Sequence, residues 1–362
     1  RHLTITGKAV AGITSVGAVI ITATKANNGA LKVTGGWTMS GGGEITATAK
    51  EATLEGDITT DETGGGTNGN LKVDVTTTLV VGTSSSSPTW TVKGALDVDA
   101  PTSITAPKGC TLAVTGAVAV DTAGVFEATD GALSVAASAG AVTISGDMQT
   151  KTSGTKHALT VTASGKLTVQ DGKTFTSVGT TTLTGSTIES GAMTVVSGEA
   201  VVVTGAWTAS GDVSVKSTDA GVELKNDLTT TGTTKNIEIE GKAASGTITL
   251  SHATANTITS TGTLTMAAKE VVSKKATLAV TGAVTLTIGG HWTATGGNLK
   301  MAGGAAITVD GNLKTVTSGD LDLVATGVFT IADGKTFTSA GTTTLTGATI
   351  ASGAATVAST GA

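Results

Sequence analysis

The chain lacks most of the residues that a conventional globular core is built from. Its 362 residues contain no Tyr, 4 Trp, 4 Phe, 3 Pro and a single Cys. Aromatic side chains supply much of the buried area of an ordinary core, so any core here is narrow and made of small branched side chains. One cysteine, Cys110, excludes an internal disulfide framework. Its sequence context favours a small buried residue at a position where the next repeat has Ala276.

Long apolar runs and excess charge are also missing. The longest apolar run falls well short of the roughly 18 residues needed for a membrane helix, so the sequence predicts no membrane span. Charged residues make up 14% of the chain and the net charge is −5. Without a basic stripe, binding to nucleic acid or to an anionic membrane surface is not expected. Hydrophobic residues make up 39% of the chain, which is too apolar a composition for a disordered coil.

The chain is instead rich in glycine and in β-branched residues. There are 51 glycines, and between Gly116 and Gly198 they follow one another at intervals of six to eleven residues. Each interval fits a strand of about five residues with a glycine turn, and three such segments make a coil of roughly 20–25 residues. Val, Ile and Thr favour strands over helices. The sequence therefore predicts an all-β, right-handed parallel β-helix (β-solenoid) of short strands.

A long internal repeat supports this architecture. Phe175-Thr-Ser-Val-Gly179 returns as Phe337-Thr-Ser-Ala-Gly341 and, with its first residue changed, as Ile13-Thr-Ser-Val-Gly17, and the two steps between copies are equal. We therefore expect one continuous solenoid over residues 1–362. Its parts are the end of a preceding unit (1–12), repeat unit 1 (13–174), repeat unit 2 (175–336) and a partial third unit (337–362).

Shorter motifs recur in the same way. Thr111–Val118 matches Thr277–Val284, and large aromatic residues recur at equivalent places, Trp37 with Trp207 and Phe126 with Trp292. A large residue that repeats at one place in a coil is expected to fill the interior. The tryptophan spacing also leaves open a string of small β-sandwiches, although the strands are short for that fold.

Two polar segments interrupt the strand pattern, Asp61–Asn70 and Thr83–Pro88. Both are rich in turn-forming residues and are expected to protrude as loops.

Three pairs of acidic residues are the candidates for catalysis: Asp97 with Asp99, Glu238 with Glu240, and Asp320 with Asp322. A spacing of two residues puts both carboxylates on one face of a strand, as glycan cleavage requires. No pair recurs in the other repeat, so we expect solvated acids, no catalytic residue and no enzymatic activity.

Ligand-binding motifs are equally sparse. The histidines His2, His157, His252 and His291 have no second ligand at metal-binding spacing, so neither a metal nor a cofactor is predicted. Threonine triplets such as Thr247-Ile-Thr249 suggest an ice-binding solenoid as one alternative, but their irregular spacing favours ordinary half-buried strands.

The segment from Gly179 to Gly198 resembles the repeat regions of secreted bacterial β-solenoid surface proteins, namely autotransporter passengers and filamentous-haemagglutinin-like adhesins. An Asn-Pro-Asn secretion motif is missing from the N-terminal region. The resemblance implies an exported, extended, non-catalytic body. Because the sequence begins at Arg1 rather than Met, we expect an export signal to have been removed and the protein to lie outside the cell or at its surface.

The ends suggest a function, because both lie in repeat sequence and open solenoid edges template further strands. We predict a structural, self-assembling subunit of an extracellular fibre, sheath or surface layer that stacks head to tail with itself. Leu3, Ile5, Ile350 and Val357 are expected near the junction. The alternatives are the stalk of a cell-surface adhesin, whose loops contact cell-surface or matrix components, and a polysaccharide-acting β-helix enzyme.

Overall fold

The computed structural model consists of β-strands, turns and short connections, with no helix among the described residues. The structure describes residues 3–6, 9–10, 13–15, 19–23, 29–40, 43–61, 69–151, 155–242 and 244–361.

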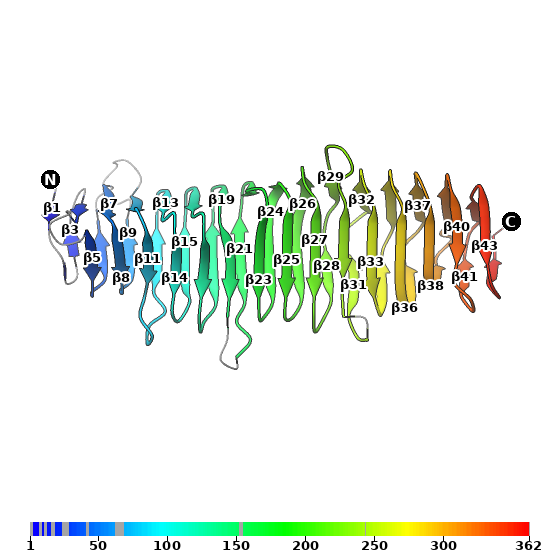
Figure 1. The fold of residues 1–362 in the computed structure, drawn as a ribbon, viewed down its shortest axis with the longest axis horizontal. Coiled ribbons are helices and arrows are strands. Elements are labelled where there is room, and N and C mark those ends of the chain that lie inside the picture. Colours follow the sequence, from blue (N-terminus) through cyan, green and yellow to red (C-terminus); the bar gives the residue numbers. More distant parts are fainter. Residues whose placement is uncertain are drawn as a thin grey trace. The chain divides into compact units, whose positions relative to one another are not determined.

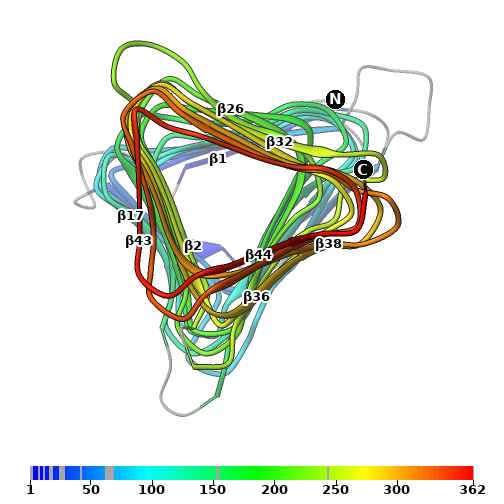
Figure 2. The same ribbon diagram turned by 90° about the vertical axis from the view of Figure 1, so that its right-hand side faces the viewer.

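Three strands make one regular coil, in which each strand pairs in parallel with the strands three before and three after it (Figure 1). For example, β12 (Thr89–Val92) lies between β9 (Ile58–Thr60) and β15 (Cys110–Val114), with Trp90 paired to Leu112 one coil further on. The described chain forms about 15 turns of about 22 residues. Viewed end on, the coils have three sides (Figure 2). The prediction of a parallel β-solenoid is confirmed, and the β-sandwich alternative is wrong.

The coils fall into two compact units, an N-terminal unit, Arg1–Ser186, and a C-terminal unit, Thr187–Ala362. In the N-terminal unit, stack 1a contains β1 (Leu3–Thr6), β4 (Val19–Thr22), β7 (Glu44–Ala49), β10 (Asn70–Val75), β13 (Leu96–Asp99), β16 (Val118–Asp121), β19 (Val142–Ile144) and β22 (Leu167–Val169). Stack 1b contains β2 (Ala9–Val10), β5 (Ala30–Val33), β8 (Glu51–Leu54), β11 (Thr78–Val81), β14 (Ser103–Ala106), β17 (Val125–Ala128), β20 (Asp147–Thr150) and β23 (Lys173–Ser177). Stack 1c contains β3 (Ile13–Ser15), β6 (Trp37–Met39), β9, β12, β15, β18 (Leu133–Ala137) and β21 (Leu159–Ala163).

The strand β24 (Thr181–Ser190) includes residues of both units. In the C-terminal unit, stack 2a contains the second half of β26 (Val201–Ala209), β29 (Leu228–Thr230), β32 (Asn256–Ser260), β35 (Ala276–Val280), β37 (Leu299–Gly303), β39 (Leu321–Ala325) and β42 (Thr343–Thr346). Stack 2b contains β25 (Met193–Ser197), β27 (Val213–Ser217), β30 (Ile237–Glu240), β33 (Leu264–Ala268), the first halves of β36 (Val284–Ala294) and β38 (Ile307–Thr315), β40 (Val328–Ile331) and β43 (Thr349–Ser352). Stack 2c contains the first half of β26, β28 (Val222–Leu224), β31 (Thr247–Leu250), β34 (Glu270–Ser273), the second halves of β36 and β38, β41 (Thr336–Ser339) and β44 (Thr356–Ser359).

Alternation along each strand builds the interior. In β15 and β35 every second residue is buried, because successive side chains of a strand point to opposite faces. Leu112, Val114, Leu278 and Val280 are therefore core residues, with at most 5% of their surface exposed.

The large residues fill the interior, as the sequence predicts. Trp37 lies on the same stack as Leu112, three coils earlier. Trp207 lies three coils before Leu278 in the same way. Equivalent motifs thus occupy equivalent places within their own units. The fully buried aromatic residues are Trp37, Trp90, Trp207, Trp292, Phe126, Phe175, Phe329 and Phe337.

The glycine spacing predicts that glycines lie in turns between short strands, and this is wrong in four long strands. β24, β26, β36 and β38 run through Gly185, Gly205, Gly289–Gly290 and Gly311. Gly205 has φ of 116°, a conformation that costs glycine little. The backbone therefore bends round the corner while it stays paired, and β26 contacts two strands of the next coil, β28 and β29.

Two further expectations concern Cys110 and the loops. Cys110 is buried, and burial raises the pKa of its thiol to about 12, so the thiol is protonated and unreactive at neutral pH. Thr83–Pro88 is a turn between β11 and β12, closed by a bridge from Thr83 to Ser86. In the predicted Asp61–Asn70 loop, residues 62–68 lie outside the described part, and Asn70 is the first residue of β10.

Candidate functional site

The acids Asp97 and Asp99 lie on the outward side of β13 in stack 1a. Asp99 is in register with Asp74 of the preceding coil and with Asp121 of the following one, so three carboxylates form one column. Strands of a sheet are about 4.8 Å apart, which sets the rise of that column. Asp97 belongs to the neighbouring column and accepts a hydrogen bond from Lys72 at 3.2 Å.

This column concentrates negative charge. Partial burial and the neighbouring carboxylates of Asp121, Asp74 and Asp97 raise the pKa of Asp99. The hydrogen bond to Asp97 raises the pKa of Lys72, which stays charged. Among the described residues, no group of three or more His, Cys, Asp or Glu side chains has an arrangement that could hold a metal ion. The column is therefore an electrostatic feature of this face.

The second pair, Glu238 and Glu240 of β30, is bound to Lys216. The Lys216 Nζ lies 2.9 Å from Glu238 Oε1 and 3.3 Å from Glu240 Oε2. Ser214 donates a further hydrogen bond to Glu238 at 2.9 Å. The Lys216 hydrogen bond, helped by Ser214, lowers the pKa of Glu238. Glu238 is thus held ionised, which is the wrong state for a general acid.

The two acids of the third pair, Asp320 and Asp322, have different surroundings. Asp320 Oδ1 accepts the backbone N–H of Thr342 at 2.9 Å, and its Oδ2 accepts Asn298 Nδ2 at 3.1 Å. Asp320 therefore caps a corner of the coil. Asp322 lies on β39, in register with Lys300 of the preceding coil.

Corner caps of this kind recur and were missed from the sequence. An Asp directly after a glycine is the available signal for Asp57, Asp147 and Asp320, whereas Asp227 follows Asn226. These carboxylates satisfy backbone donors that would otherwise be left unpaired. Backbone N–H groups at the start of a strand donate to an Asp side chain one coil earlier at 2.7–2.8 Å, as in Thr89 to Asp57, Thr174 to Asp147 and Thr257 to Asp227.

The repeated Phe-Thr-Ser-x-Gly motif is also a corner. Phe175 is in the interior, and Ser177 Oγ donates to the carbonyl of His157 at 3.1 Å. A Cβ on Gly179 would lie 2.7 Å from the carbonyl carbon of His157, so only glycine allows this approach. In the later copy, Ser339 Oγ donates to the carbonyl of Gly319 at 3.0 Å. The motif that defines the repeat is thus structural.

The three histidines that the structure describes do not form a common site. His157 Nε2 lies 3.2 Å from Asp130 Oδ1, and Asp130 also binds Lys108. His252 contacts the backbone of its own turn, and His291 is exposed on β36. His2 lies outside the described residues.

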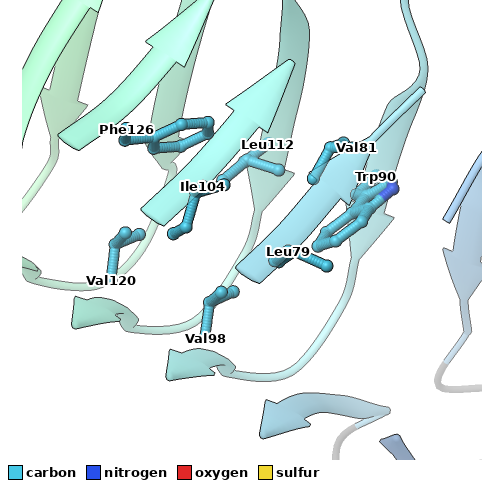
Figure 3. A pocket seen from close by; sticks show the side chains of 8 residues that line it. All are labelled: Leu79, Val81, Trp90, Val98, Ile104, Leu112, Val120 and Phe126. Atoms are coloured by element: carbon cyan, nitrogen blue, oxygen red, sulfur yellow. The ribbon is translucent and has the colours of Figure 1, made fainter. Parts of the chain in front are cut away.

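One gap in the interior of the N-terminal unit is too small for a ligand. Figure 3 shows eight apolar side chains that project into the core from successive coils of the N-terminal unit. The gap between them does not accommodate a water molecule. The residues are Leu79, Val81, Trp90, Val98, Ile104, Leu112, Val120 and Phe126.

Two of the predicted assembly residues continue interior columns onto an exposed surface. Ile350 pairs with the buried Phe329, and Val357 pairs with the buried Phe337. Yet Ile350 is 48% exposed and Val357 47% exposed. We call these two residues, on β43 and β44, the open edge.

The other two assembly residues lie on β1. Leu3 and Ile5 pair through the backbone with Val19 and Ile21, which are both buried. The side chains of Leu3 and Ile5 are outside the described part of the structure.

Among the described residues, no helix has the length and apolar character to cross a membrane. Comparison of the chain with protein-family models, with curated proteins and with solved structures finds no match.

Proposed function

We propose that the protein is a non-catalytic structural subunit of an extracellular fibre, sheath or surface layer, and that it assembles head to tail with copies of itself. The open edge carries this proposal. Ile350 and Val357 occupy positions that are buried in every other described coil of their columns, such as Phe329 and Phe337 one coil earlier. A strand from a second copy would bury them and pair with the backbone of β43 and β44.

The side chains of Ile350 and Val357 would make a modest contribution to the free energy of association. Ile350 and Val357 are already half buried. Full burial of an Ile or Val is worth about 1.5–3 kcal/mol, so together the two would add roughly 2 kcal/mol. Most of the association would come from extending three stacks of parallel strands by one coil, since each stack offers unpaired backbone donors and acceptors.

The acidic residues favour a structural role over catalysis. Glu238 is held ionised by Lys216, and Asp320 caps a corner. Catalysis of glycan cleavage needs a proton donor beside a second carboxylate, and neither pair offers one. Asp97 and Asp99 are the remaining candidates, because the pKa of Asp99 is raised beside further carboxylates. Under the proposal, we expect that replacing both by Asn removes no glycan-cleaving activity.

An extracellular or cell-surface location is part of the proposal. It is supported by the likeness of the Gly179–Gly198 segment to secreted bacterial β-solenoid surface proteins and by the repetitive, low-aromatic composition.

The test places charge on the open edge. In the variant Ile350→Asp/Val357→Asp, an added strand would bury unpaired carboxylates, so polymers should be lost while the fold is kept. The matched control, Ala351→Asp/Ala358→Asp, puts the same charge on the same strands at the alternate positions, which point away from the interior columns. Sedimentation velocity and negative-stain microscopy report the result. Polymers as long as wild type in the first variant, or a wild type that stays monomeric at high concentration, would contradict the proposal.

Deleting residues 1–11 or 352–362 provides a second test. Each truncation should fold, because the interior coils keep their neighbours, and neither should polymerise. Filaments of normal length from both truncations would show that assembly uses the lateral faces.

An adhesin stalk is the second candidate. The Thr83–Pro88 turn favours it, since Thr83 Oγ1 lies 2.9 Å from Ser86 Oγ and the turn is braced for display between β11 and β12. The mass of the native chain separates the two functions. A mass near 35.0 kDa within long polymers supports assembly, whereas a chain several times longer supports the stalk.

A further inference from the structure

The C-terminal unit has a hollow on the outer side of stack 2a, where β32, β35 and β37 begin. Its volume is 290 Å³, and it is lined by Ala255, Lys275, Thr277, Asn298 and Lys300. These residues come from three successive coils. We call it the lysine hollow.

The packing of Lys275 against the next coil shapes this hollow. Lys275 directly precedes β35, and its side chain lies against the backbone of Gly297 in the next coil. A Cβ on Gly297 would come within 2.9 Å of Lys275 Cε, so the lack of a side chain there lets the Lys275 stem lie across the next coil. Lys300 is in register with Thr277. Lys275, Thr277 and Lys300 thus line one space.

Neither ammonium group has an acidic partner in the described part of the protein. Other lysines of the same unit do, for example Lys216 with Glu238 and Lys335 with Asp310 at 2.9 Å each. No hydrogen bond is formed by the Thr277 hydroxyl with the described residues. Three side chains whose donors have no described acceptor therefore line a space large enough for a small anion.

Two acids lie beside the hollow. Asp320 is bound to Asn298 and to the backbone of Thr342, which leaves Asn298 engaged as well. Asp322 is in register with Lys300, but no ion pair joins them in the described structure. The positive charge at the hollow is thus reduced by its neighbours but not cancelled within it.

We propose that the lysine hollow binds an oxyanion, a sulfate or a carboxylate group, between Lys275, Lys300 and the Thr277 hydroxyl. Ammonium groups bind such anions as point charges. Interactions of this kind at an exposed site are weak and are screened by salt, so one hollow binds in the millimolar range. The site lies outside the open edge, and head-to-tail assembly does not require it.

The experiment is equilibrium dialysis of the whole protein against labelled sulfate and, separately, labelled acetate, with NaCl varied to hold the ionic strength constant. Dialysis is insensitive to whether the protein is polymerised. We expect saturable uptake of one anion per chain, weakened at least tenfold in Lys275→Gln/Lys300→Gln. The control Lys314→Gln, which removes an exposed lysine of β38 outside the hollow, should bind as wild type does.

The two probes identify the ligand group. Uptake of sulfate alone indicates a sulfate site, uptake of acetate alone a carboxylate site, and uptake of both a general oxyanion site. Absence of saturable uptake in the wild type, or equal uptake by the Lys275/Lys300 variant with normal circular dichroism, overturns the proposal. Neither result bears on the assembly hypothesis, because that hypothesis is tested by the length of the polymers.

Discussion

Trp292 donates its indole N–H to Ser273 Oγ at 3.0 Å in the buried interior, and the two residues belong to adjacent coils. Trp207 makes the same bond to Ser190 at 2.9 Å. In each case a small hydroxyl of the preceding coil satisfies a polar hydrogen that the apolar interior would otherwise leave unpaired.

Trp90 lacks this bond. The corresponding hydroxyl of the preceding coil belongs to Thr60, which donates to the carbonyl of Gly69 and accepts the backbone N–H of Lys93 at 3.0 Å. The buried Nε1 of Trp90 has no hydrogen-bond partner among the described residues. The indole N–H is therefore hydrogen-bonded in Trp207 and Trp292 and unpaired in Trp90 within the described structure.

Removing the serine should destabilise the C-terminal unit. In Ser273→Ala the buried Nε1 of Trp292 loses its acceptor, which typically costs about 1–3 kcal/mol. Urea unfolding followed by tryptophan fluorescence measures the change. Ser245→Ala, at an exposed turn, is the control and should be nearly neutral. If the two variants unfold at the same urea concentration, the bond contributes nothing to stability.

A charged side chain in the interior should lower the stability of the fold far more than one on the outer surface. Leu278 is fully buried, so Leu278→Asp would bury an unpaired carboxylate and cost several kcal/mol, roughly 3 or more. Thr281 is exposed, and Thr281→Lys should be nearly neutral. Thermal unfolding followed by circular dichroism compares them. A wild-type melting temperature for Leu278→Asp is the result that the coil assignment does not allow.

Asp130 should make the fold sensitive to acid. Its hydrogen bond from Lys108, followed by that from His157, lowers the pKa of Asp130 below its ordinary value of 3.8. Since the folded pKa is lower than the unfolded one, the stabilisation is present above about pH 4 and is lost as pH falls through the folded pKa. Asp130→Asn should therefore lower the melting temperature at pH 6 and have a smaller effect near pH 2. A constant difference at both values would contradict this linkage.

Asp99 should have the opposite effect on the pH dependence of folding stability. Burial and the neighbouring carboxylates raise its pKa, so its ionised form is disfavoured in the folded state. Stability is then lost as pH rises from the unfolded pKa through the folded pKa. Asp99→Asn should raise the melting temperature at pH 7, and this gain should disappear in acid. Asp97→Asn is the matched comparison, because it removes the partner of Lys72 and should not stabilise. Destabilisation by Asp99→Asn at pH 7 would argue that its carboxylate has a bound partner.

Much of the fold follows from local pattern. Alternation in Thr111–Val114 decides which side chains point inward, and that is a property of a single strand. The number of strands per coil follows from the glycine spacing. The corners were harder to predict, since Gly205 and Gly311 look like turn residues and yet lie within paired strands.

The roles of polar residues depend on the neighbouring coil and are less visible in the sequence. The cap on Thr342 comes from Asp320, 22 residues earlier, whereas that on Thr174 comes from Asp147, 27 residues earlier. Loop insertions change this separation, so no fixed spacing identifies a cap. The lysine hollow was missed for the same reason, because Lys275 and Lys300 are distant in sequence and meet only when the coils stack.

The parallel pairing of each strand with the next coil also determines how either unit would yield to a pulling force. Hydrogen bonds between coils point along the direction of stacking, so a pull on the last coil opens them one after another instead of shearing a whole sheet at once. A coil holds about 22 residues. At about 3.4 Å per extended residue, each detached coil would add roughly 75 Å of chain. A stretched unit should therefore lengthen in steps of one coil, and the coils left behind would keep their own interior and fold.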